Sequence, residues 1–243
     1  MKFIAHASSS KANAYEVFAS NGNRLLIDCG VPWPQIQKYL GYKMLPIIGC
    51  LISHGHITDH CKAAADVLKQ GIPIYAGWDT LEAVGLDGAA GTTPIALPLD
   101  KPLEIGPFHV FAFHVKHDVP NLGFIITDND TSDQLFFAVD TPNITQRFDC
   151  QFQIIAIGCN YDNSILRKRV ASGKMNEAGA KRLLHAHMEK SVCKKYIQDF
   201  CNLSRCEEIH LLHMSSGNID KEATRQEFED ELFVPVFIGG QKC

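Results

Sequence analysis

The sequence predicts an α/β fold in which two β-sheets pack against each other and helices cover their outer faces. Three observations lead to this prediction. Expected strands come in two blocks, and each block is followed by helices, which suits two packed sheets with helices outside. A chain of 243 residues with 46% hydrophobic residues can bury a sizeable core. No repeat, low-complexity tract or linker divides it, so we expect a single domain over residues 1–243.

The first block of strands occupies the opening third of the chain. Residues 17–18 and 25–27 are rich in β-forming types and are separated by Asn21-Gly22-Asn23, a hairpin-type turn. A helix is expected over 60–70, with Thr58 as its N-cap and Gly71 ending it. The other elements expected in this half are a short helix over 34–40 and strands over 50–53 and 72–75.

The second block runs from 103 to 139 and is rich in strand-forming residues, with turns at 106–107 and 128–130. Helices and strands alternate after it. Val192, Tyr196 and Phe200 are expected on one face of a helix. The last predicted elements are a strand over 209–212 and a helix over 221–232.

Composition argues against several classes of protein. No apolar run approaches the length of a membrane span, and the N-terminus turns polar at Ser8, so we expect neither a membrane span nor an export signal. The nine cysteines include no close pair, which indicates buried or free thiols in a reducing cytoplasm. A net charge of -4 argues against a surface coated with phosphate contacts.

A local excess of positive charge contrasts with this net charge. Between Asn163 and His185 the only acid is Glu177. The cations in this basic stretch are Arg167, Lys168, Arg169, Lys174, Lys181 and Arg182. Such a run is compatible with a solvated helical face and equally with a patch that faces phosphates.

The most informative segment is the eight-residue run from Ser53 to His60, which contains three histidines and an aspartate. It lies between a hydrophobic strand and an expected helix start. Imidazole and carboxylate groups together suit zinc, manganese or iron. On an extended loop, residues two apart point the same way, so His54 and His56 can share one ion. Asp59 and His60 are turned away from them and can serve a second ion.

This segment resembles the His-x-His-x-Asp-His signature of the metallo-β-lactamase superfamily. The resemblance implies an αββα four-layer sandwich of two mixed β-sheets with outer helices, and two divalent metal ions. It also implies three more metal ligands: His117, Asp140 bridging both ions, and His213. His109 and His114 are the alternatives to His117.

Further segments match the same superfamily pattern. The run from Leu26 to Gly30 resembles its early strand-Asp-Gly element. In that element Asp28 would support the metal loop, residues 54–60, from below. The amino-acid sequences of residues 8–15, 71–76 and 160–162 resemble those of the YycJ/WalJ-like group of small nucleases and phosphodiesterases. In that group's pattern Ala12 stands where a glycine is usual, and Met188 stands where a small hydroxyl residue is usual.

The resemblance to this group also implies a non-ligand histidine that acts on the phosphate or leaving group. His187 matches it, with His185 as the alternative. We therefore predict a dinuclear-metal-dependent hydrolase of phosphodiester bonds, acting on DNA, RNA or a small diester, with Asp59 and His187 as catalytic residues. The predicted substrate-binding residues are Arg167, Lys168, Arg169 and Asn160. Three aromatic residues could stack on bases or belong to the core, namely Trp78, Phe148 and Tyr161.

Other functions remain compatible with the metal motif. A thioesterase or lactonase of the glyoxalase II type would share all the metal ligands, and only the basic stretch and His187 favour phosphate. A zinc β-lactamase would need an export signal and a different residue at Asp140. A binding module without activity would not need the complete set of ligands.

Overall fold

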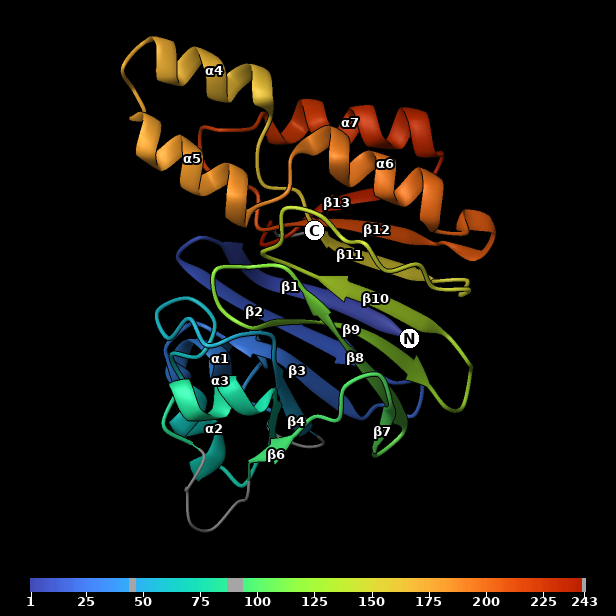
Figure 1. The fold of residues 1–243 in the computed structure, drawn as a ribbon. Helices are drawn as coiled ribbons and strands as arrows, with labels where there is room; N and C mark the ends of the chain where they lie inside the picture. Colours follow the sequence, from blue (N-terminus) through green and yellow to red (C-terminus); the bar gives the residue numbers. More distant parts are fainter. Residues whose placement is uncertain (44–46, 87–93, 242–243) are drawn as a thin grey trace.

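Two mixed β-sheets stack at the centre of the structure, a computed structural model that describes residues 1–43, 47–86 and 94–241 (Figure 1). The first sheet contains, in spatial order, β1 (Lys2–Ser9), β2 (Ala12–Phe18), β3 (Arg24–Cys29), β4 (Ile47–Ile52), β5 (Ile74–Ala76) and β6 (Ile95–Ala96). The pairs β1–β2 and β2–β3 are antiparallel, and the remaining pairs are parallel.

The second sheet contains β7 (Pro102–Ile105), β8 (Phe108–Val115), β9 (Asn121–Asp128), β10 (Gln134–Ala138), β11 (Ile154–Gly158), β12 (Glu208–Leu212) and β13 (Val236–Ile238), in this spatial order. Its pairs are antiparallel from β7 to β10 and parallel from β10 to β13. The prediction of two mixed sheets with outer helices is confirmed.

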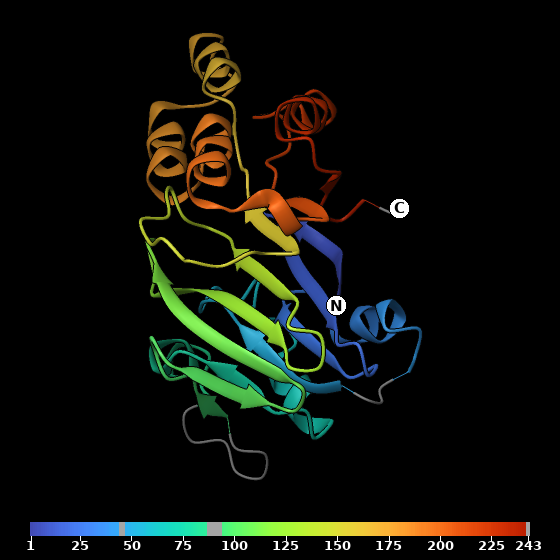
Figure 2. The ribbon, with the colours of Figure 1, turned by 90° about the vertical axis from the view of Figure 1, so that its right-hand side faces the viewer.

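Helices cover the outer face of each sheet. Those on the first sheet are α1 (Trp33–Tyr39), α2 (Ala64–Lys69) and α3 (Trp78–Ala83). The second sheet carries α6 (Lys190–Phe200) and α7 (Lys221–Leu232), with a 3-10 turn at Leu203–Arg205. The basic stretch forms two helices, α4 (Asn163–Ala171) and α5 (Glu177–Ala186), of which α4 lies farther from the sheets in both views (Figures 1 and 2). None of the helices in the described residues is long and apolar enough to cross a membrane.

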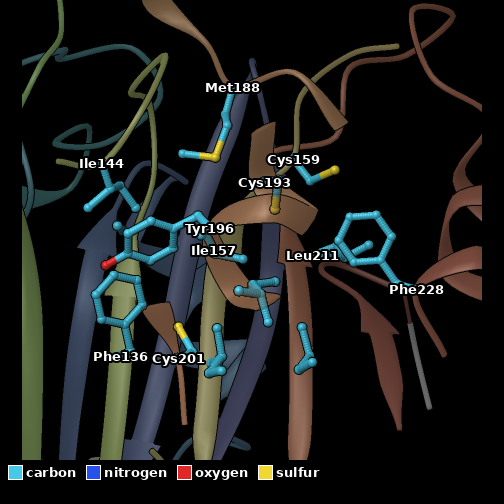
Figure 3. Packing of buried hydrophobic residues seen from close by; sticks show 14 of the residues in the cluster. Phe136, Ile144, Ile157, Cys159, Met188, Cys193, Tyr196, Cys201, Leu211 and Phe228 are labelled. Atoms are coloured by element: carbon cyan, nitrogen blue, oxygen red, sulfur yellow. The ribbon is translucent and has the colours of Figure 1, made fainter. Parts of the chain in front are cut away.

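The core is divided by the second sheet, whose central strands are buried on both faces. Neighbouring residues of a strand point to opposite faces, so Phe136 and Phe137 enter different clusters. Phe137 lies between the sheets with Phe124, whereas Phe136 packs under α6, with its ring centroid 5.8 Å from that of Tyr196 (Figure 3). Continuous apolar runs in these strands therefore reflect burial on two sides.

The helix expected over 60–70 is shorter than predicted. It begins at Ala64, and Thr58 is not its N-cap. The preceding backbone is held by the first sheet instead: the Cys29 N–H donates to the His60 carbonyl at 2.7 Å, and the Ala63 N–H donates to the Cys29 carbonyl at 2.9 Å. These bonds compete with helical ones, because each backbone group has limited bonding capacity.

The buried face of α6 also differs from the prediction. Cys193, Tyr196 and Ile197 are buried, whereas Val192 is 39% exposed. The buried stripe therefore runs from Cys193 to the residues three and four positions later, and not from Val192 in steps of four. The predicted helix over 221–232 coincides with α7. The cysteines in the described residues are free thiols, as expected, and Cys243 lies outside the described residues.

Candidate metal centre

Three predicted ligands and the predicted supporting residue Asp28 lie at the ends of four strands. Asp28 lies near the end of β3, His54 follows β4, Asp140 follows β10 and His213 follows β12. Asp28, Asp140 and His213 have positive φ angles of 56°, 51° and 52°. Left-handed backbone costs free energy for residues other than glycine, so a surrounding structure must hold it in place, and such positions cluster at functional sites.

The structure brings the seven predicted metal ligands together in overlapping clusters. One cluster contains His54, His56 and His117, and a second contains Asp59, His60 and His213. His109 and His114 are exposed on β8 and belong to none of the described clusters. Of the three histidines considered for this ligand, His117 is therefore the one that lies in the cluster.

Asp140 lies between the two clusters. Its Oδ2 is 3.0 Å from His60 Nε2 and 3.8 Å from His54 Nε2, while its Oδ1 is 3.2 Å from His213 Nδ1. Oδ2 thus faces one histidine of each cluster, and Oδ1 faces a histidine of the second, so the carboxylate lies against both clusters, as a bridging ligand must. The amide of the buried Asn121 donates to the Asp140 carbonyl at 2.8 Å and fixes the strand end.

Asp28 supports the metal loop from below, as the resemblance implies. Its carboxylate accepts hydrogen bonds from the Ser53 N–H at 2.9 Å and from His60 Nδ1 at 2.8 Å. The second bond turns Nε2 of His60 toward Asp140 and the cluster. Carboxylates that hold the far nitrogen of a ligating histidine in this way are common around bound metals.

Two neighbouring segments fix the metal loop from the sides. Both the backbone N–H and the side-chain amide of Asn13 donate to the Asp59 carbonyl. Gly30 must be a glycine, because a Cβ built there would lie 1.7 Å from the Asp59 carbonyl oxygen. The start of β2, at Asn13, and the end of β3, followed by Gly30, therefore both fix the position of Asp59.

The pKa values of the histidines differ with their surroundings. Burial lowers the pKa of His54 well below its usual value, and burial lowers that of His213 to about 4. Burial also opposes the charged form of His60, but the carboxylates of Asp28 and Asp140 outweigh it and raise the pKa of His60 to about 10. Neutral imidazole is the form that binds a metal ion, so His54 and His213 are ready to do so.

Four buried polar atoms of the cluster have no hydrogen-bond partner among the described residues. They are His117 Nε2, Asp140 Oδ1, His187 Nδ1 and His213 Nε2. Unsatisfied buried polar groups are rare, and an ion is one of the few explanations for several together. Imidazole and carboxylate donors in this number fit a pair of divalent ions.

His187 enters this site and His185 does not. His187 follows the last turn of α5, and its Nδ1 is 3.1 Å from Asp140 Oδ1. The ring stacks on His213 with centroids 5.3 Å apart. His185 is exposed on α5 and is not among the residues that line the cleft over the cluster.

A cleft of about 330 Å³ opens over the cluster. The predicted residue Asn160 lines it, but its amide donates to the His213 carbonyl at 2.9 Å and its Oδ1 accepts from the Met188 N–H at 2.8 Å. Both bonds commit Asn160 to positioning His213 and the segment after α5. A contact between Asn160 and the substrate stays a prediction.

The predicted cations Arg167, Lys168 and Arg169 lie on α4, outside the residues that line the cleft. Arg169 donates to the Gly217 carbonyl at 2.9 Å. Arg182 and Asp118 line the cleft instead, although neither was predicted to bind the substrate. Both residues could have been found from the sequence, because Asp118 directly follows the predicted ligand His117 and Arg182 belongs to the basic stretch.

The three aromatic residues divide between core and surface. Tyr161 is buried in the small cluster between α4 and α5, and Phe148 packs against the cluster under α6. Trp78 is 58% exposed at the start of α3. Among the three, Trp78 is therefore the one whose ring is largely open to solvent.

Comparison with known families is consistent with this geometry. A family model described as "Metallo-beta-lactamase superfamily" matches residues 10–141, which include six of the predicted ligands. The chain belongs to the metallo-beta-lactamase superfamily. Family membership and the histidine–aspartate clusters together identify a metal-dependent hydrolase of this fold. A search of curated proteins found no match to the sequence.

Several solved structures share the fold over nearly the whole chain. The metallo-beta-lactamase fold protein YhfI from Bacillus subtilis is 20% identical, with a TM-score of 0.72 and coverage of 97% of this chain and 95% of its own. Unliganded yeast PDE1 is 10% identical, with a TM-score of 0.67 and coverage of 98% and 96%. The short form of human tRNase Z is 14% identical, with a TM-score of 0.61 and coverage of 98% and 96%. The more specific likeness to the YycJ/WalJ-like group stays a prediction.

We expect the purified metallo-beta-lactamase-fold protein to bind about two divalent ions per chain, because its ligands form two groups joined by Asp140. Elemental analysis after loading with zinc or manganese and desalting measures this number. His54→Ala removes a ligand from one group and should lower the number, whereas His109→Ala, on the exposed side of β8, should not. At most one ion in the loaded wild-type protein, with His54→Ala no different, would contradict the assignment.

Proposed function

We propose that the protein uses two divalent ions to hydrolyse phosphodiester bonds, with a nucleic acid as the substrate. The observation that carries the proposal is His187, whose side chain enters the cleft beside Asp140 from outside the two triads of His54, His56, His117 and of Asp59, His60, His213. A histidine at this place can act on the substrate while other residues hold the ions.

Bound ions would supply a nucleophile at neutral pH and neutralise negative charge that develops on a phosphoryl group. Asp140 would join the two halves of the site, and Asp28 keeps His60 turned toward it. Asp59 lines the cleft from the metal loop and is proposed as both ligand and catalytic residue. His187 would donate a proton to the leaving oxygen, which gains negative charge as its bond to phosphorus breaks.

Two solved structures with this fold support the choice of phosphodiester substrates. One is named as a tRNase, and the other is named as yeast PDE1. An assay of the metal-loaded protein on a chromogenic phosphodiester, a thioester and a lactone tests the reaction class. We expect metal-dependent cleavage of the phosphodiester at the highest rate. Good hydrolysis of the thioester or lactone, with no cleavage of any phosphodiester, would refute the proposal.

The nucleic-acid part of the proposal depends on α4, since Arg167 and Lys168 are exposed there beyond the cleft. Two phosphate contacts release bound counterions, so neutralising both residues to glutamine should lower the slope of log binding constant against log salt by about two for duplex DNA. Binding of labelled DNA or RNA at several salt concentrations measures this slope. Arg169 is kept in this variant because its bond to the Gly217 carbonyl holds α4.

The small chromogenic phosphodiester should still be cleaved by this double variant, because neither side chain lines the cleft. Neutralising Lys2, exposed on β1, and Lys101, exposed just before β7, is the matched control and should leave the slope unchanged, because both elements lie away from α4 (Figure 1). An equal change in both double variants would mean that α4 contributes only to the overall charge, and the nucleic-acid contact would be rejected.

A further inference from the structure

Arg182 is the only lysine or arginine among the described residues that line the cleft. The other charged groups of the lining belong to the metal cluster or are acidic, as Asp118 is. Arg182 was not needed for the proposed reaction, and its side chain is 78% exposed. A guanidinium that faces a cleft over a metal site can bind two oxygens of one anion, because its donors form a planar fork.

The backbone of α5 fixes where Arg182 lies. His117 Nδ1 is 3.2 Å from the Ala186 carbonyl oxygen, and His187 follows with Nδ1 near Asp140. The end of α5 is thus tied to both halves of the metal cluster. Arg182 precedes Ala186 by four residues and lies on the same face of the helix. Leu183 and Gly179 complete this face of the cleft.

The carboxylate of Asp118 marks the position of an anion between the metal cluster and Arg182. Its Oδ1 is 3.0 Å from His117 Nε2 and 3.3 Å from His56 Nε2, and its Oδ2 is 3.9 Å from Arg182 Nη2. One small anionic group therefore faces two histidines of a triad with one oxygen and the guanidinium with the other. A phosphoryl group in a similar place would do the same with two of its oxygens.

The pair between Asp118 and Arg182 is easily exchanged. The carboxylate is 42% exposed, and the distance of 3.9 Å is at the limit for an ion pair. Exposed pairs of this kind contribute little to stability. A phosphate that offers two oxygens to the guanidinium at hydrogen-bond distance would be the better partner.

We propose that Arg182 binds a non-bridging oxygen of the substrate phosphate and makes the site specific for anionic esters, with Asp118 as its partner when no substrate is bound. The proposal rests on the proposed function and names the residue that recognises the phosphate. Because the contact is made by the bound substrate as well as in the transition state, its loss should appear mainly in KM.

The test compares Arg182→Gln with Lys181→Gln, the neighbouring cation of α5 that does not line the cleft. For metal-loaded Arg182→Gln, we expect KM for a chromogenic phosphodiester to rise by about tenfold or more, as for loss of a hydrogen bond to a charged group, with kcat changed by less than about threefold. Lys181→Gln should behave as wild type. Arg182→Lys keeps the charge without the fork and should fall between the two.

A second measurement does not depend on catalysis. Calorimetric titration of the metal-loaded proteins with inorganic phosphate should show binding weakened by about tenfold in Arg182→Gln and unchanged in Lys181→Gln. Metal content is measured alongside and should be equal in all variants, because Arg182 belongs to none of the described clusters. The exposure of the Arg182 side chain makes these substitutions compatible with folding.

The outcomes separate this inference from the proposed function. If Arg182→Gln matches wild type in KM and in phosphate binding, or if Lys181→Gln changes as much, the inference is overturned. If the wild-type protein cleaves no phosphodiester, the proposed function fails. The contact between Arg182 and phosphate is then tested by phosphate binding alone. Weaker phosphate binding by Arg182→Gln then still supports the contact, and equal binding overturns it.

Discussion

Asp140→Asn is expected to lose metal and to lower turnover of a phosphodiester by about a thousandfold or more, because charge stabilisation by the ions accounts for several kcal/mol of barrier lowering. The carboxylate places one oxygen 3.0 Å from His60 Nε2 and the other 3.2 Å from His213 Nδ1. Oδ2 also lies 3.8 Å from His54 Nε2 of the other cluster. An amide of the same shape carries no charge and offers only one acceptor oxygen, so it is a poorer partner for two ions.

Elemental analysis and steady-state kinetics on the same preparation measure both effects. Asp149→Asn, on an exposed segment away from the cluster, is the matched control and should keep full metal content and turnover. Circular dichroism checks that Asp140→Asn is folded. A folded Asp140→Asn protein with two ions per chain and near wild-type turnover would show that Asp140 does not bridge the two halves.

His187→Ala is expected to keep its metal ions and to lose about a hundredfold in turnover, the usual contribution of a positioned general acid. His187 lies against Asp140 and His213, and these three residues also form a possible metal-binding group. The metal content of the variant therefore distinguishes a histidine that acts on the substrate from one that holds an ion.

His185→Ala is the control for this prediction, since His185 lies on the same helix two residues earlier and is exposed away from the cleft. We expect its metal content and turnover to match wild type. Loss of an ion from His187→Ala would make His187 a ligand. Unchanged turnover with both ions in place would remove it from the mechanism.

Much of the metal centre could be predicted because its residues carry a local signal. The segment from His54 to His60 contains four ligands on one loop, and the remaining ligands follow hydrophobic strands that are readable in the sequence. The ends of neighbouring strands meet at one edge of a sheet, so ligands far apart in the chain converge there. The order of strands agrees with this convergence, but His117, Asp140 and His213 were predicted from the resemblance to the superfamily pattern.

The start of α2 could not be predicted, because it depends on bonds between distant segments. Local propensity favours a helix from His60, but the backbone near Asp59 and His60 is bonded to Asn13 and Cys29 of other strands. Helix propensity is a weak signal when tertiary hydrogen bonds compete with it. The same bonds hold the metal loop in its shape.

The substrate residues could be predicted only in part. The basic stretch was recognised from its charge, but charge alone does not show which cations of a helix face the cleft. Arg182 faces it because Ala186 and His187 are tied to the metal cluster, and this depends on contacts with His117 and Asp140. Arg167 and Lys168 lie on the preceding helix, beyond the turn between α4 and α5.

The rate of phosphodiester hydrolysis as a function of metal ions bound per chain tests the central claim most directly. Metal-free protein is titrated with zinc or manganese, and the rate on a chromogenic phosphodiester is measured together with the bound metal. We predict little activity up to one ion and a maximal rate as the number approaches about two, since both halves of the site contribute to the reaction. A maximal rate at one bound ion, or no phosphodiester cleavage at any metal content, would contradict the account.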